Sequence, residues 1–201
     1  MMTITYPVGS GLYVNMTNRC PCACTFCLRH NGDGVYGSDS LWLDREPTVA
    51  EVCADLDKRD LAQYSEIVFC GYGEPTERLD DLLAVAAYIK SKIDIPVRIN
   101  TNGLADLIHG ESVAHKLKGL IDTVSISLNA TDAEEYNRVV RPKFGLPSYE
   151  AMLKFAADCV AVVPRVVMTV VDVVTSPEEQ ERCREICESI GATLRVRPYE
   201  E

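Results

Sequence analysis

Short apolar segments alternate with amphipathic segments along almost the whole of this 201-residue chain. The apolar segments are rich in β-branched residues and are predicted to be strands, whereas the amphipathic segments repeat apolar residues at helical spacing. The predicted strands cover residues 11–15, 66–70, 97–100, 122–128, 165–171 and 193–197. Because strands that alternate with helices pair in parallel through right-handed crossovers, this pattern restricts the chain to an α/β fold.

Capping residues mark where the helices between these strands begin. Thr48 with Glu51, and Thr131 with Glu134, have the spacing of a capping box. The last helix is expected to start at Ser176, with proline and acidic residues in its first turn, and to end at Gly191. The remaining predicted helices cover residues 48–57, 79–92, 111–118, 131–139 and 148–160.

Two architectures fit this alternation, an open doubly wound sheet and a partial barrel. A parallel strand with helices on both faces should be apolar throughout, yet Ser125, Ser127 and Asn129 give one predicted strand a polar face. The same alternation adds Arg98, Asn100, Asn102, Arg195 and Arg197 to the interior. We therefore predict a partial (β/α)6 TIM-like barrel of parallel strands, forming one domain over residues 1–201, with its active site at the carboxyl ends of the strands.

Composition indicates where in the cell the protein is located and which classes of partner it is unlikely to bind. The first residues have neither a basic segment nor an apolar segment of the kind found in secretory signals, and no apolar run is long enough for a membrane helix. Nine cysteines, an odd number, indicate reduced thiols and a cytoplasmic protein without a membrane partner. A net charge of −10 makes nucleic acid an unlikely partner, because its binding requires clustered cationic side chains.

Four of the cysteines lie within eight residues, at Cys20, Cys22, Cys24 and Cys27. One interpretation is a structural zinc site made of all four thiolates. Ligands at every second residue strain such a site, and zinc knuckles usually combine two separated C-x-x-C pairs. The other interpretation is an iron–sulfur cluster held by three thiolates, which leaves one iron open for chemistry.

The second interpretation has a family resemblance behind it. Cys20, Cys24 and Cys27 form C-x-x-x-C-x-x-C with Phe26 before the last cysteine, which resembles the signature of the radical S-adenosylmethionine (SAM) superfamily. The resemblance implies that these three cysteines hold a [4Fe-4S] cluster and that Cys22 is not a ligand. Within the superfamily, the compact length and the Asn-Arg before Cys20 look like the TatD-associated radical SAM proteins.

Two further motifs carry the resemblance. Residues 71–75 (Gly-Tyr-Gly-Glu-Pro) are similar to the family's G-G-E-P motif, with Tyr72 in place of a glycine, and residues 100–103 resemble its x-T-N-G strand end. Ser127 and Asn129 match strand positions that contact the ribose and the carboxylate of SAM. The resemblance therefore implies SAM contacts at Gly71, Tyr72, Gly73, Glu74, Asn100, Asn102, Ser127 and Asn129. It identifies no catalytic side chain.

The implied activity is that of an oxygen-sensitive enzyme. A one-electron donor such as a flavodoxin or ferredoxin would drive cleavage of SAM to a 5′-deoxyadenosyl radical, which takes hydrogen from an unidentified substrate. A barrel open on one side predicts a protein or peptide substrate that closes it. The alternative is a small anionic substrate under the loop 31–43, which would also satisfy Arg195 and Arg197. The competing functions are a non-catalytic iron–sulfur electron carrier and a zinc-binding structural protein.

Overall fold

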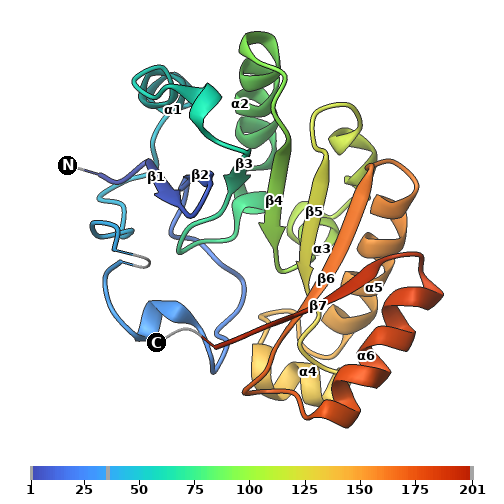
Figure 1. The fold of residues 1–201 in the computed structure, drawn as a ribbon. Coiled ribbons are helices and arrows are strands. Elements are labelled where there is room, and N and C mark those ends of the chain that lie inside the picture. The colour runs from blue at the N-terminus through green and yellow to red at the C-terminus, as the bar shows by residue number, and fades with distance from the viewer. Residues whose placement is uncertain (1, 35–36, 200–201) are drawn as a thin grey trace.

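A computed structural model describes residues 2–34 and 37–199, and it contains one sheet of seven strands in the order β1 to β7 (Figure 1). Strands β1 and β2 form an antiparallel hairpin, and all later neighbours are parallel. The strands are β1 (Thr5–Val8), β2 (Gly11–Val14), β3 (Glu66–Phe69), β4 (Val97–Thr101), β5 (Thr123–Ser127), β6 (Arg165–Val171) and β7 (Thr193–Arg197).

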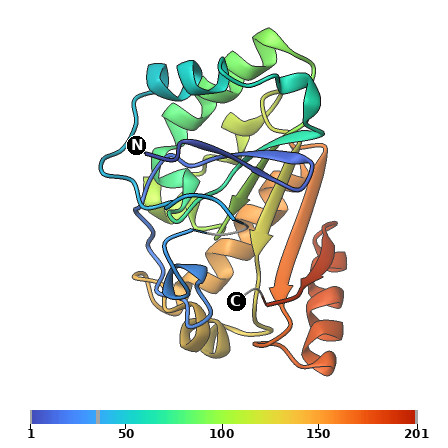
Figure 2. The ribbon, with the colours of Figure 1, turned by 60° about the vertical axis from the view of Figure 1, so that its left-hand side comes forward.

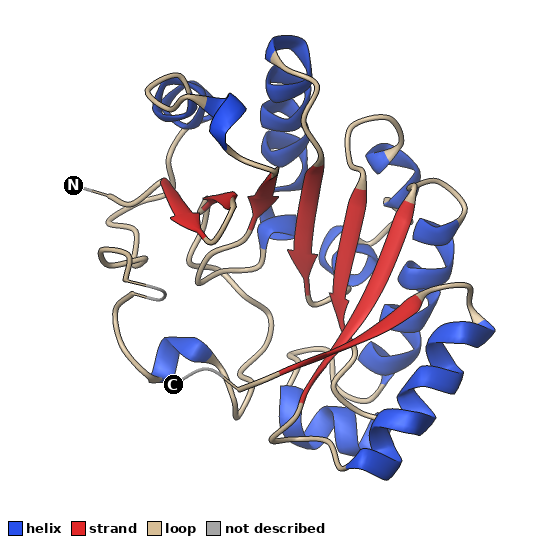
Figure 3. Cartoon of the chain, in the orientation of Figure 1, coloured by secondary structure: helices blue, strands red, loops and turns tan. Residues whose placement is uncertain are grey.

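The helices between the strands lie on one side of the sheet, as Figures 1 and 3 show. They are α1 (Val49–Leu56), α2 (Leu79–Lys92), α3 (Ala105–His109), α4 (Ala133–Val140), α5 (Pro147–Val160) and α6 (Pro177–Ser189). A doubly wound sheet reverses its strand order at a switch point, whereas this order is consecutive. The α/β fold with parallel strands of a partial barrel is therefore confirmed. None of the described helices is long and apolar enough to cross a membrane.

The two faces of the sheet differ in chemistry. Val97, Ile99, Val124, Ile126 and Met168 point to the helices, and all of them are buried. On the opposite, inner face, residues that pair in register on neighbouring strands form rows across the sheet. The first row is Arg98, Thr123 and Arg165; the second is Asn100, Ser125, Val167 and Thr193; the third is Ser127, Thr169 and Arg195. The polar inner face expected from the sequence is thus continuous across β4 to β7.

The carboxyl ends of β4, β5 and β6 point to the end of the molecule where residues 18–31 lie, as Figures 1 and 2 show. In parallel α/β folds this edge carries the functional site. The candidate site is therefore built from the cysteine loop and from the residues that directly follow β3, β4 and β5.

Three details differ from the sequence-based expectations. A seventh strand, β1, precedes the six predicted ones. Helix α4 is capped by Asp132, whose side chain accepts from the Glu135 backbone, one residue later than the predicted box at Thr131. The helix predicted at 111–118 is only a 3-10 turn at Ala114–Leu117, because α3 comes before it and ends at the left-handed Gly110.

Candidate metal centre and cofactor site

The cysteine loop, residues 18–27, is held in place by the end of α4 and by the chain that follows it. The Thr25 backbone N–H donates to the Val139 carbonyl at 2.9 Å, and the Lys143 N–H donates to the Pro21 carbonyl at 2.8 Å. These bonds lie on either side of Cys22, which itself forms a β-bridge with Pro142. The loop conformation is therefore set by main-chain contacts, before any metal is considered.

The four cysteines of this loop fall into two groups. Cys20, Cys24 and Cys27 are partly exposed, whereas Cys22 is 5% exposed and packs in the core. A hydrogen bond with Cys22 lowers the pKa of Cys20, while hydrogen bonding with Cys20 and Cys24 raises the pKa of Cys22 itself. Cys22 is thus a buried donor beside the three expected ligands.

The arrangement of the sulfurs bears on the zinc alternative. Among the described residues, no group of three or more His, Cys, Asp or Glu side chains is placed to hold a single metal ion. In a [4Fe-4S] cluster each thiolate binds a different iron, so its ligands surround a larger body than one ion. Three partly exposed thiolates on one loop match the donor set of such a cluster, whereas a four-thiolate zinc site would need the buried Cys22 as its fourth ligand.

The motif 71–75 packs directly against the chain that leads into the cysteine loop. A Cβ atom on Gly73 would lie 2.2 Å from the Thr17 carbonyl oxygen and 2.7 Å from that of Arg19. A Cβ atom on Gly71 would lie 2.1 Å from Oδ1 of Asn15. Both positions therefore require glycine because of close approach, and Asn15 is a supporting residue that sequence reasoning missed.

Glu74 joins the ends of β3 and β4. Its carboxylate is 4% exposed and accepts from Thr101 Oγ1 at 2.7 Å, from the Asn102 N–H at 2.7 Å, and from the N–H and Oγ1 of Thr76. Burial raises the pKa of Glu74, although each of these hydrogen bonds acts to lower it. Glu74 thereby positions both strand ends, a role that Thr76 and Thr101 share and that the sequence alone did not indicate.

Several buried polar atoms at this edge lack hydrogen-bond partners among the described residues. Oδ1 of Asn100, Oδ1 of Asn129 and the Tyr136 hydroxyl are buried without hydrogen bonds. Asn129 also holds a left-handed conformation, at φ 57°. Because buried polar groups are normally satisfied, such groups around one edge are expected at a site that takes a polar ligand.

Asn102 brings this edge into contact with the cysteines. Its Nδ2 lies 3.6 Å from Cys22 Sγ and 4.0 Å from Cys20 Sγ, and its Oδ1 accepts from the Leu104 N–H. Ser127 lies two residues before Asn129 on the inner face, partly exposed. The structure therefore brings Asn102 to the cysteines and places Asn100, Ser127 and Asn129 along the same inner face.

The side chain of Tyr72 points away from this edge. It is buried, packs edge-on against Trp42 with ring centroids 5.0 Å apart, and donates to the Gly32 carbonyl at 2.7 Å. Only the backbone of Tyr72 is then available at the edge. The tyrosine instead fixes the loop that follows the cysteines.

One more arginine, Arg197, lies on the inner face at the carboxyl end of β7. Arg197 follows the row of Ser127 and Thr169, and it pairs in register with Val171. Its Nε is buried and has no hydrogen-bond partner among the described residues, and its charge lowers the pKa of Cys70 next to the glycine turn, opposing the rise that burial causes. Arg197 is therefore a cationic group at the level of the expected SAM contacts.

Comparisons with known proteins identify the family of the chain. Residues 14–190 match the Radical SAM superfamily. The chain is 28% identical over 192 residues to a GTP 3′,8-cyclase of Mycolicibacterium smegmatis (94% of this chain, 49% of that protein), and 30% identical over 135 residues to a probable dual-specificity RNA methyltransferase RlmN of Trichodesmium erythraeum (65% and 36%).

The fold is shared with solved structures. SuiB of Streptococcus suis bound to S-adenosylmethionine superposes with a TM-score of 0.69 at 16% identity, over 94% of this chain and 40% of that one. The chain spans about half, or less, of the length of the curated relatives named above. The matched residues include the cysteine loop, the glycine turn and strands β3 to β6. The chain therefore belongs to the radical SAM superfamily, whose enzymes use a [4Fe-4S] cluster and SAM.

Proposed function

We propose that this protein cleaves SAM reductively and uses the 5′-deoxyadenosyl radical to take a hydrogen atom from a substrate. The observation that carries this proposal is that three partly exposed cysteines lie on the loop that Asn102 contacts, at the same edge of the sheet as the unpartnered amide oxygens of Asn100 and Asn129. An electron carrier would need only the thiolates, and it has no use for buried orphaned amides at the strand ends. When bound, the cluster and SAM supply the electron and the radical.

The chain itself supplies positioning. We assign Cys20, Cys24 and Cys27 as cluster ligands, because they lie on a loop that main-chain bonds already hold. Cys22 lies in the core, within hydrogen-bonding reach of Cys20 and Cys24. No side chain has to act as a general base in this step, since the protein binds, orients and excludes water.

Contacts to SAM are assigned by level along the sheet. We propose that the backbone of Gly71, Tyr72 and Gly73 binds the amino group of SAM, and that Glu74 shapes this turn. Its carboxylate is occupied by protein donors. The polar groups on the neighbouring strands come from Asn100, Asn102, Ser127 and Asn129. Arg197 provides the positive charge that pairs with the carboxylate of SAM, because the neutral side chain of Asn129 has no charge to offer.

Anaerobic reconstitution tests the proposal. About four irons per chain, with 5′-deoxyadenosine formed from SAM and dithionite, would support it. Iron without 5′-deoxyadenosine would identify an electron carrier, and zinc in place of iron would identify a structural site.

The relatives differ in what their names say they act on, a nucleotide in one case and RNA in the other. We propose that the protein is one of the TatD-associated radical SAM proteins, and the start of the cysteine motif supports this. We also propose a cytoplasmic location, which the reduced thiols support. The proposed electron donor is a flavodoxin or ferredoxin. A protein or peptide substrate has one observation in its favour: Val173 and Val196, near the free edge of β7, are 60% and 37% exposed. A small anionic substrate is favoured by the three arginines, Arg98, Arg165 and Arg195, that line a cavity on the inner face of the sheet.

A further inference from the structure

The inner face of the sheet contains a cavity of about 420 Å³, which lies toward the amino ends of the strands from the candidate SAM edge. Its volume lies within the range of roughly 300–1,000 Å³ that is usual for small-molecule sites. The lining comes from the amino-terminal halves of β3 to β7, and consists of Glu66, Arg98, Thr123, Ser125, Arg165, Val167, Thr193, Leu194 and Arg195. Only two of these side chains are apolar, so the cavity is suited to a polar ligand.

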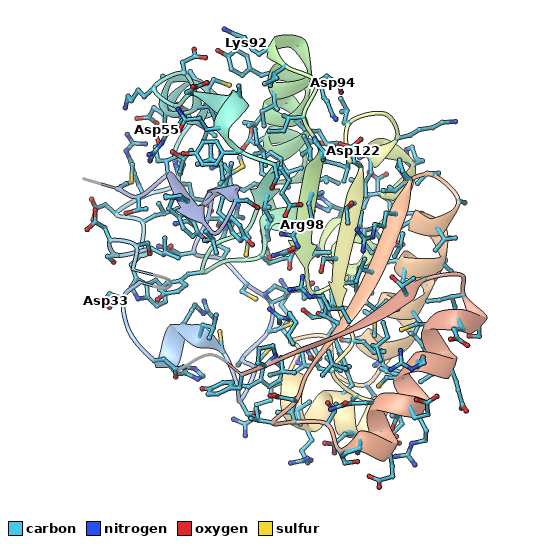
Figure 4. The ribbon with its side chains drawn as sticks, viewed as in Figure 1. Asp33, Asp55, Lys92, Asp94, Arg98 and Asp122 are labelled. Carbon is cyan, nitrogen blue, oxygen red and sulfur yellow. The ribbon has the colours of Figure 1, made fainter. Side chains whose placement is uncertain are left out.

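The charge of this cavity opposes that of the whole chain. The chain carries a net charge of −10, but three arginines and a single acid line the cavity. The Arg98 side chain extends from β4, as Figure 4 shows. It is 13% exposed, is paired with Glu66 at 2.8 Å, and also donates to the Tyr13 hydroxyl. The pair leaves two positive charges without a counter-charge in the lining.

Those two charges belong to Arg165 and Arg195. Both residues are solvent-exposed, and neither side chain makes an ion pair or a hydrogen bond with any described residue. Arg138 and Arg184 on the helices, by contrast, are each paired with a glutamate. Nε of Arg98 is also buried without a partner. Donors remain free on guanidinium groups from three strands around one cavity.

The strand register places two of these groups in one row and the third further along the sheet. Arg98 and Arg165 are both register partners of Thr123, so their Cα atoms are two strand spacings, roughly 10 Å, apart across the face. Arg195 extends from β7, the next strand, where it pairs in register with Thr169, four residues further along β6 than Arg165. All three side chains line the same cavity. Long side chains that share one face of a curved sheet point toward its axis, and planar guanidinium groups bind phosphate and carboxylate through paired hydrogen bonds.

We propose that this cavity binds the oxyanion of a small substrate, a phosphate or a carboxylate, through Arg98, Arg165 and Arg195. The inference rests on the proposed function, because it names the substrate class of the same site. Ser125 lines the cavity and Asn129 lies at the SAM edge, four residues further along the chain, or roughly 13 Å. The substrate is therefore elongated, with its anionic group in the cavity and its hydrogen-donating carbon toward the cysteine loop.

Anion binding is measured on the anaerobically reconstituted protein with SAM, by calorimetry at low and constant ionic strength. The probes are inorganic phosphate, succinate as the carboxylate, and glycerol as the neutral control. Arg165→Gln and Arg195→Gln remove unpaired charges without exposing a buried acid, so both variants should fold. Arg184→Gln on α6 is the matched control, since it removes the same charge from a helix surface.

We expect the wild type and Arg184→Gln to bind one of the two anions with equal affinity. Arg165→Gln and Arg195→Gln should each bind it about tenfold more weakly, which corresponds to the loss of one charge-assisted hydrogen bond. The anion that binds more tightly assigns the substrate as a phosphate or a carboxylate. If neither anion binds, if glycerol binds equally well, or if Arg184→Gln weakens binding as much, the proposal is wrong. Absence of binding would favour the protein or peptide substrate.

The proposed function is tested separately, by 5′-deoxyadenosine formation in the wild type. Anion binding without 5′-deoxyadenosine would leave the anion site standing and remove the enzymatic role. SAM cleavage without anion binding would do the reverse.

Discussion

Glu74 is the residue on which the two strand ends depend. Its carboxylate, at 4% exposure, takes hydrogen bonds from Thr76, Thr101 and Asn102. Asn102 in turn lies beside Cys20 and Cys22. A single buried acid therefore connects the glycine turn, the end of β4 and the cysteine loop, which makes it a positioning residue for the whole edge.

The change Glu74→Gln should destabilise the protein by about 1–3 kcal/mol, because the amide offers one acceptor fewer to buried donors. Burial raises the pKa of Glu74, so this group stabilises the fold fully below its ordinary value of 4.5 and progressively less as pH rises above it. Urea unfolding of both proteins across this range should show their difference in free energy shrinking with rising pH. Glu188→Gln, an exposed acid, should show no such trend, and a constant gap for Glu74→Gln would contradict the assignment.

Two cysteine substitutions separate ligand from neighbour. Cys24→Ala should abolish the cluster, since it removes one of three thiolates, while Cys22→Ala should keep about four irons per chain. Iron and sulfide analysis with electron paramagnetic resonance of the reduced protein measures both. Equal loss in the two variants would favour a four-thiolate site and argue against the assignment of Cys22 as a buried donor.

At this scale the sequence is informative about residue types and less so about roles. The spacing of Cys20, Cys24 and Cys27 predicts three ligands without reference to the fold. The function of Glu74 depends on where Thr101 and Asn102 come to lie, and the role of Tyr72 depends on Trp42, so neither could be predicted from local sequence.

At the scale of elements, the close packing of the glycine turn against the chain entering the cysteine loop gives a direct test. Gly73→Ala would place a methyl group 2.2 Å from the Thr17 carbonyl oxygen, so one of the two backbones must move. We expect a lower melting temperature and poor cluster incorporation. Gly32→Ala is the matched control, because its Cβ would meet nothing closer than 4.0 Å. Normal iron content in Gly73→Ala would show that the turn does not set the loop position.

The elements that sequence analysis found are those with strong local signals. The capping box of Thr48 and the helix start at Ser176 are both present, and Gly191 follows α6 with a φ of 81°. Strand β1 was missed because it contains Pro7, which is tolerated only at a sheet edge. Helix α3 was missed because five residues are too few to show a helical period.

Across the whole molecule, stability should be graded from the middle of the sheet outward. Strands β4, β5 and β6 are each paired on both sides and covered by helices, whereas β1 and β7 have one partner each in the described sheet. Hydrogen exchange should therefore be slowest for amides of β4 to β6 and fastest among strands for β1 and β7. Protection of β7 equal to that of β5 would indicate that a further strand or a second chain covers its edge.

The bonds between the cysteine loop and the end of α4 have a mechanical consequence. The loop cannot swing outward unless the contacts from Thr25 to Val139 and from Lys143 to Pro21 break together. Loss of iron should then loosen a segment more than a hundred residues away along the chain. Amide exchange at Thr25 and Lys143 should accelerate to the same extent when iron is chelated. The loop and the end of α4 would then open as one cooperative unit that the bound cluster keeps closed.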